Sequence, residues 1–96
     1  MPDPSAAPVP SPSSPVRIIL VDDDPLTRAA IKPLLRPRED YAVVAEAGDG
    51  RQAIEAVERV EADIVLMDLG MPVMDGIEAT RQICAAPRHP HVVALT

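Results

Sequence analysis

The chain has 96 residues, which is room for one small domain, and its formal net charge of −6 argues against binding nucleic acid through this segment. Its single cysteine excludes an internal disulfide and a cysteine-based zinc site, and we expect Cys84 to be a buried small hydrophobe. No apolar run could span a membrane and the start lacks the pattern of a secretory signal, so we expect a cytoplasmic protein without membrane partners.

Two regions differ in composition. Residues 1–15 hold six of the twelve prolines and almost no core-forming side chains, which predicts a disordered tail rich in Pro, Ser and Ala. Residues 16–96 are rich in small aliphatic residues and contain neither Phe nor Trp. This second region is predicted to form one small domain of marginal stability.

The first strand and helix are predicted within residues 16–35. The run VRIILV (16–21) is typical of a strand that is buried on both faces. Asp24 and Pro25 then predict a helix start, with Asp24 as the N-cap. Pro33 predicts a kink or an early end of this helix. Apolar residues recur at helical spacing between these two signals and just beyond: Leu26, Ala29, Ala30, Leu34 and Leu35.

Three further strands and two helices follow. Strands are predicted at YAVVAEA (41–47), DIVLMD (63–68) and HVVALT (91–96), and a turn at GDG (48–50). The helix after that turn has one apolar face, formed by Ala53, Ile54, Val57 and Val60. The next helix has Asp75 as a cap at capping-box spacing from Glu78. Its apolar side comprises Ile77, Thr80, Ile83 and Cys84.

This β-α-β-α-β-α-β order predicts an α/β fold with a doubly wound parallel sheet and helices on both faces. In such sheets, ligands bind beyond the carboxyl ends of the strands. Asp22 and Asp23 follow the first strand, Asp68 ends the third and Thr96 ends the fourth. Carboxylates that converge there repel one another unless a hard divalent cation is bound, and oxygen ligands favour Mg²⁺.

Three segments give a specific resemblance. IILVDDDPLTR, DIVLMDLGMPVMDGIEATRQI and VVALT resemble, in order and spacing, the receiver domain of two-component response regulators. VDDDPLTR and VMDGIEATR are similar to regulators with a LuxR-type helix-turn-helix output domain. The resemblance implies a flavodoxin-like sheet of strand order 2-1-3-4-5. The fifth strand and the last two helices have no counterpart here, so residues 16–96 are interpreted as a receiver domain incomplete at its C-terminus.

The resemblance also implies roles for individual residues. Asp68 would be the phosphoacceptor. Mg²⁺ would be bound directly by Asp23, largely through a water by Asp22, and also by Asp68 and the backbone carbonyl of Gly70. Thr96 would hydrogen-bond a phosphoryl oxygen and report phosphorylation to the rest of the domain.

The implied partner is a sensor histidine kinase, with a second copy of the chain as a further candidate. DNA would be bound only through a missing C-terminal output domain. The domain would not be an enzyme, beyond assisting its own phosphorylation and dephosphorylation. Two alternatives stay open: a pseudo-receiver or inactive fragment that binds partners without phosphorylation, and an aspartate-nucleophile phosphohydrolase. For the latter, Asp22 and Asp24 fit a D-x-D pattern, but Leu26 stands where a hydroxyl or β-branched residue is expected.

Other polar residues are expected to be structural. Asp63 is interpreted as a solvated acid, and His89 and His91 lie in a loop without a third ligand nearby. Lys32, within the first helix, cannot replace the phosphate-binding lysine that the family carries on its fifth strand. We therefore expect slow or absent phosphorylation. We also expect exposed apolar surface on the sheet face that carries the first helix, and the fourth strand as an open edge.

Overall fold

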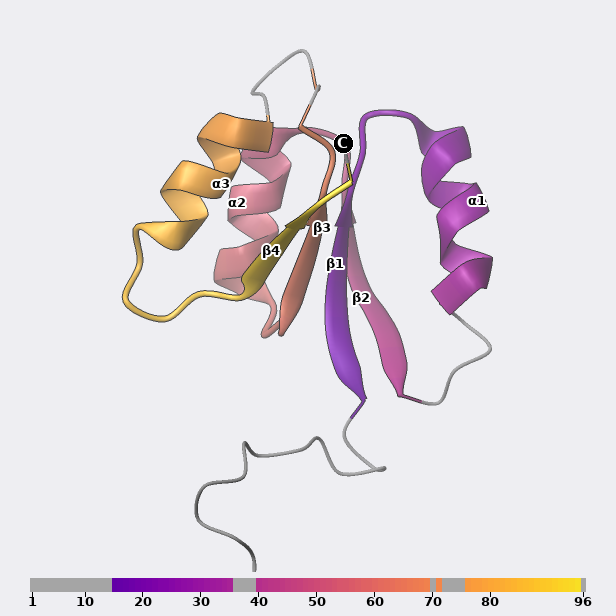
Figure 1. The fold of residues 1–96 in the computed structure, drawn as a ribbon, viewed down its shortest axis with the longest axis horizontal. Coiled ribbons are helices and arrows are strands. Elements are labelled where there is room, and N and C mark those ends of the chain that lie inside the picture. Colours follow the sequence, from indigo (N-terminus) through magenta and orange to yellow (C-terminus); the bar gives the residue numbers. More distant parts are fainter. Residues whose placement is uncertain (1–14, 36–39, 70, 72–75, 96) are drawn as a thin grey trace, which may run out of the picture.

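The computed structural model describes residues 15–35, 40–69, 71 and 76–95. Four strands alternate with three helices (Figure 1). In chain order they are β1 (Val16–Val21), α1 (Pro25–Leu35), β2 (Tyr41–Ala47), α2 (Gly50–Arg59), β3 (Ile64–Met67), α3 (Gly76–Cys84) and β4 (His91–Ala94). The predicted order is confirmed, with β3 and β4 shorter than expected. The predicted tail lies outside the described residues, apart from Pro15.

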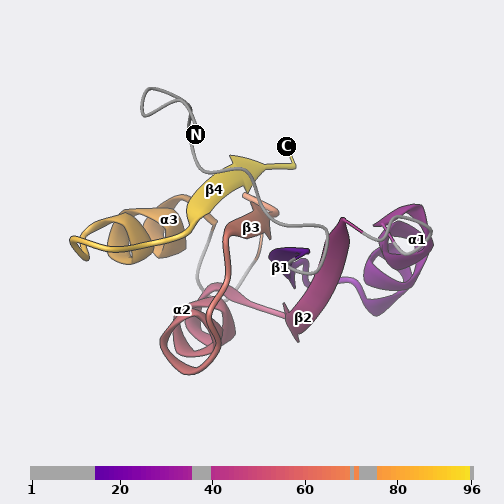
Figure 2. The same cartoon turned by 90° about the horizontal axis from the view of Figure 1, so that it is seen from below.

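The strands form one parallel sheet of order β2-β1-β3-β4. Leu20 of β1 pairs with Leu66 of β3, which pairs with Val93 of β4, so these side chains share one face of the sheet. Figure 2 shows α2 and α3 on one face and α1 alone on the other. This arrangement confirms the flavodoxin-like doubly wound fold over its first four strands, and β4 is an edge strand as predicted.

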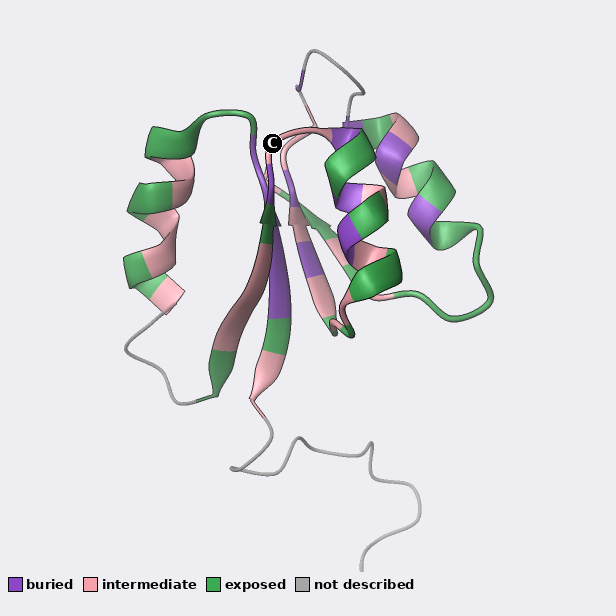
Figure 3. Ribbon diagram, turned by 180° about the vertical axis from the view of Figure 1, so that it is seen from behind, coloured by how far each residue is buried: buried purple, intermediate pink, exposed green. Residues whose placement is uncertain are grey.

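The core lies between the sheet and the pair of helices α2 and α3. It comprises Ile19, Val21, Ala47, Ala53, Ala56, Val65, Met67, Met71, Ala79 and Ile83. Ile18 and Leu20, whose side chains point to the α1 face, are also buried. Figure 3 shows β1 as buried through most of its length. The expectation of a strand buried on both faces is therefore confirmed.

The predicted inner face of α3 is wrong in part. Ile77 is 66% exposed and Cys84 is exposed, whereas Gly76, Ala79 and Ile83 are buried. Small residues allow α3 to approach its neighbours closely, and that close packing selects the face that carries Gly76 and Ala79. The buried position expected for Cys84 is thus corrected, because this residue lies on the solvent side of the last turn.

Helix α1 is bonded to the end of β1 and to β2 through Arg28 and Lys32. It has no buried residue, and Leu26 and Leu34 are 78% and 75% exposed. On the sheet face that carries α1, Val93 of β4 is 45% exposed, which agrees with the exposed apolar surface predicted there. Of the kink or early end expected at Pro33, the early end does not occur at that residue, since α1 continues to Leu35. The missing N–H affects only the last turn there, and Lys32 anchors that turn to β2 through Glu46. No helix in the described ranges is long and apolar enough to cross a bilayer.

Asp63 is more than the solvated acid that was expected. It is exposed, but its Oδ2 accepts the backbone N–H of Arg17 at 2.9 Å, and its own N–H donates to the Arg17 carbonyl at 2.8 Å. These bonds join the start of β1 to the residue before β3. Asp63 therefore helps to set the register of the sheet at the end opposite the predicted site.

Candidate functional site

Two acidic residues follow β1 at the carboxyl edge of the sheet. Asp22 is buried, and its N–H donates to the Ala47 carbonyl at 3.1 Å, which continues the pairing with β2. Its Oδ1 accepts the N–H of Asp24 at 2.9 Å. Asp23, the next residue, is exposed. Successive residues of an extended chain point to opposite sides, so Asp22 is buried and Asp23 is exposed to solvent.

Asp68 comes to the same edge because β1 and β3 are adjacent parallel strands. Val21 pairs with Met67, so the residues that follow each strand lie side by side. The N–H of Asp68 donates to the Val21 carbonyl at 3.0 Å, which fixes the main chain of this half-buried residue. The pairing of two strands therefore brings together residues that are far apart in the sequence.

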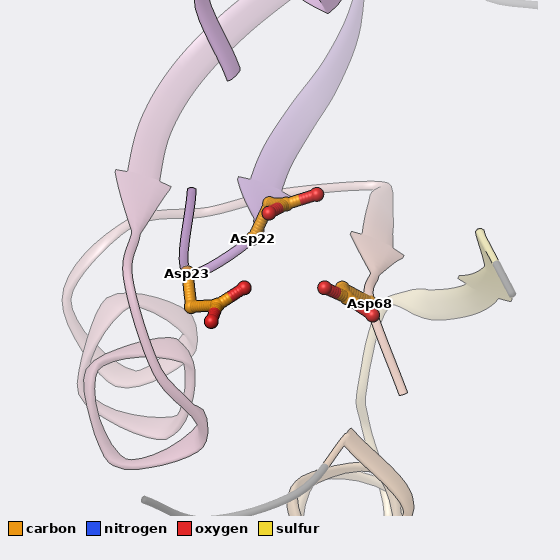
Figure 4. A group of neighbouring side chains, drawn as sticks. All are labelled: Asp22, Asp23 and Asp68. Carbon is orange, nitrogen blue, oxygen red and sulfur yellow. The ribbon is translucent and has the colours of Figure 1, made fainter. Parts of the chain in front are cut away.

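The three carboxylates form one group, which we call the acidic cluster: Asp22, Asp23 and Asp68. One oxygen of each lies within 4.8 Å of the others. Figure 4 shows the side chains of Asp23 and Asp68 directed toward each other across the gap between the two strand ends. The sequence predicted this convergence.

The donor set fits a hard divalent cation. Three carboxylates supply oxygen ligands only, which Mg²⁺ prefers over the softer metals. Their mutual repulsion, with Asp22 buried, is a cost that a bound cation relieves. Within the described ranges, no other group of three His, Cys, Asp or Glu residues is close enough to hold a metal. Neither His89 nor His91 belongs to such a group.

Asp24 lies outside the acidic cluster and forms the helix N-cap that was predicted. Its Oδ1 accepts the N–H of Leu26 at 2.9 Å, and its Oδ2 accepts the Thr27 hydroxyl at 3.1 Å. The bond from the Leu26 N–H, followed by that from Thr27, lowers the pKa of Asp24 below its usual value. Asp24 thus caps α1. The three other positions named from the sequence, Gly70, Asp75 and Thr96, lie outside the described residues.

Two residues next to the acidic cluster were missed by the sequence analysis. Arg28 donates from Nη1 to the Asp22 carbonyl and from Nε to Glu46. Gly76 packs on the main chain of Asp68, and its N–H donates to the Leu69 carbonyl at 3.2 Å. The glycine within VMDGIEATR was a signal that could have been followed. Arg28 ends the segment VDDDPLTR, but its partners lie at the end of β1 and on β2, and no local pattern in the sequence names them.

Comparison with known proteins shows which family the chain belongs to. The response regulator receiver domain family matches residues 18–96, and the chain belongs to this family. A receiver domain is a signalling module of a phosphorelay, and this role is distinct from that of an enzyme.

Individual proteins similar to this chain include response regulators. The transcriptional regulatory protein LiaR of Bacillus subtilis is 38% identical over 81 residues, which are 84% of this chain and 38% of LiaR. A LuxR-family two-component response regulator from Aurantimonas sp. SI85-9A1 is 42% identical with a TM-score of 0.78, over 84% of this chain and 58% of that one. The response regulator domain of Thermotoga maritima CheB is 31% identical with a TM-score of 0.79, over 83% and 59% of the two chains. The chain thus spans well under half of LiaR.

Proposed function

We propose that Asp68 accepts a phosphoryl group from the phosphohistidine of a sensor histidine kinase, with Mg²⁺ held at the acidic cluster. The observation that carries this proposal is the convergence of Asp22, Asp23 and Asp68 at the carboxyl edge of the sheet. Membership of the receiver family supports it. The domain would work in the cytoplasm as a switch.

In the proposed step, a carboxylate oxygen of Asp68 attacks the phosphorus atom. The P–N bond breaks, its electron pair stays on the imidazole nitrogen, and the product is an acyl phosphate on Asp68. The loose transition state of phosphoryl transfer makes positioning and charge neutralisation the main contributions. Bound Mg²⁺ would offset the negative charge of the phosphoryl oxygens. The bond from the Asp68 N–H to Val21 keeps the acceptor in place on the sheet.

The residues of the acidic cluster would have different roles. Asp23 is exposed and is proposed to bind Mg²⁺ directly. Asp22 is proposed, by resemblance, to act largely through a water, and its Oδ1 also accepts the N–H of Asp24. The Gly70 carbonyl is proposed as a further metal ligand and Thr96 as the residue that contacts the phosphoryl group, both by resemblance alone.

Partners and output are also proposals. The match to a transcriptional regulator supports control of transcription through an output domain that would bind DNA. A second copy of the chain is a further candidate partner. On this view residues 16–96 act as the receiver and residues 1–15 as a tail outside it.

Acetyl phosphate tests the proposal without the kinase. We expect the full chain, incubated with Mg²⁺ and acetyl phosphate, to gain the mass of one phosphoryl group and to lose it to hydroxylamine. Labelling should be slow, since Lys32, the one lysine of the chain, lies on α1 and is bound there to Glu46 of β2. Asp68→Asn should abolish the label, whereas the matched control Asp63→Asn should retain it because Asp63 lies at the opposite end of the sheet.

Other outcomes would identify the alternatives. If prolonged incubation at saturating Mg²⁺ gives no label, the proposal is wrong for this chain and partner binding without phosphorylation is favoured. Sustained turnover of the acetyl phosphate would instead indicate a phosphohydrolase. The engagement of Asp24 as a helix cap counts against that activity, because a D-x-D site needs this carboxylate free.

A further inference from the structure

Arg28 connects three elements beside the acidic cluster. From α1, its Nη1 donates to the backbone carbonyl of Asp22 at the end of β1. Its Nε donates to Oε1 of Glu46 on β2 at 3.2 Å. One turn later on the same helix, Lys32 Nζ binds the other oxygen, Oε2, of Glu46 at 2.9 Å.

The surroundings hold the guanidinium of Arg28 in this place. The Arg28 side chain is 21% exposed, less than its partner Glu46 at 35%. It also lies against the turn after β2, where a Cβ built on Gly48 would be 3.5 Å from Nη1. A planar guanidinium that donates in two fixed directions restricts both of its acceptors.

The bond to the Asp22 carbonyl has a geometric consequence for the acidic cluster. This carbonyl belongs to the peptide group between Asp22 and Asp23. The N–H of Asp22, in the preceding peptide group, is held separately by Ala47. The orientation of the second peptide plane helps to set the direction in which Asp23 leaves the main chain, and Asp23 faces Asp68 (Figure 4).

We propose that Arg28 is a positioning residue for the cation site: it fixes the Asp22–Asp23 peptide so that Asp23 is directed toward Asp68. This inference rests on the proposed function, because it assumes that Mg²⁺ binds at the acidic cluster. Outer groups that orient metal ligands typically contribute about 10- to 100-fold to metal affinity. Glu46 has the secondary role of orienting the guanidinium.

The positive charge of Arg28 and its proposed positioning role predict opposite changes in Mg²⁺ affinity when Arg28 is replaced. A positive charge near a cation site repels the cation, so removing that charge alone should tighten Mg²⁺ binding. If Arg28 positions Asp23, removing it should weaken Mg²⁺ binding despite the lost repulsion. The sign of the change in affinity therefore separates the two roles.

The experiment is a Mg²⁺ titration by isothermal calorimetry of the full chain and three variants. We expect Arg28→Met to raise the Kd for Mg²⁺ about tenfold. Lys32→Met is the matched control, since it removes one positive charge and one bond to Glu46 but leaves the Asp22 carbonyl bound. Its Kd should be unchanged or lower. Arg28→Lys keeps the charge and should also weaken binding, because an ammonium cannot donate in the same two directions.

The other outcomes of the titration separate the positioning role of Arg28 from the cation site itself. Arg28→Lys serves as the measurement if Arg28→Met fails to fold, which a circular-dichroism melt without metal would show. Mg²⁺ binding to both Arg28 variants as tight as to the wild type would overturn the positioning role and leave the proposed function intact. Failure of the wild-type chain to bind Mg²⁺ would instead refute the cation site itself, and the positioning role with it.

Discussion

Replacement of Gly76 by alanine tests how closely α3 is seated on the main chain of Asp68. A Cβ at this position would lie 2.2 Å from the Asp68 carbonyl oxygen, 2.6 Å from the Leu69 Cα and 2.9 Å from the Asp68 carbonyl carbon. All three are backbone atoms, which cannot turn aside as a flexible side chain would. The start of α3 or the Asp68 strand end must therefore move by about 1 Å to reach ordinary contact distances.

The expected cost follows from these contacts. Overpacking of this kind costs roughly 1–3 kcal/mol. The better helix propensity of alanine returns at most about 1 kcal/mol. Because the three contacts are short and all involve backbone atoms, the overpacking cost should lie in the upper part of its range, at about 2–3 kcal/mol. The net loss of about 1–2 kcal/mol in the free energy of unfolding then corresponds to a fall in Tm of roughly 4–16 °C for a domain of this size. Mg²⁺ binding should also weaken, because the displaced residue is Asp68.

Thermal unfolding followed by circular dichroism, with and without Mg²⁺, is the assay. Gly48→Ala is the matched control, since a Cβ there would lie 3.5 Å from both Arg28 Nη1 and Gln52 Oε1, an ordinary contact distance. That variant should melt at or slightly above the wild-type temperature, because alanine restricts the unfolded chain. A Gly76→Ala protein that melts at the wild-type temperature and binds Mg²⁺ normally would refute the reasoning.

Three further predictions concern single side chains. Asp24→Ala should melt at a lower temperature than Asp24→Asn, since asparagine can still accept the Leu26 N–H; equal melting curves would argue against the cap. The pKa of Glu46 is lowered, first by the hydrogen bond from Lys32, so its stabilisation is present above the ordinary pKa of 4.5 and is lost as pH falls through the folded value. Glu46→Gln should therefore flatten the dependence of Tm on pH below about 4.5, and an unchanged acid limb would contradict this. Cys84 should react with a thiol reagent in the folded protein as fast as in urea, whereas protection would place it in the core.

Local patterns in the sequence were sufficient for the order of the elements and for the three members of the acidic cluster. The run from Val16 to Val21 is apolar at every position but Arg17, which is enough to indicate a strand covered on both faces. Asp24 followed by Pro25 marked the start of α1 correctly. The alternation of strands and helices then implied a parallel sheet, and a parallel sheet brings Asp22, Asp23 and Asp68 to one edge.

The orientation of α3 shows where local patterns fail. Ile77 and Cys84 have the hydrophobicity of core residues, yet Gly76 and Ala79 face inward. Hydrophobicity ranks side chains by their transfer out of water, but the depth of the space beneath a helix is set by the neighbouring backbone. Here that backbone is so close that a single Cβ at Gly76 would collide with it.

By itself, the sequence determined the order of strands and helices, the cap of α1 and the identity of the acidic residues, because each depends on neighbours within a few positions. Only the tertiary structure decided what holds those acids in place. Arg28 meets Asp22 and Glu46 because β1 and β2 pair, and Gly76 meets Asp68 because α3 packs back on the end of β3. Such contacts join residues that are distant in sequence, so their geometry exists only once the sheet has formed.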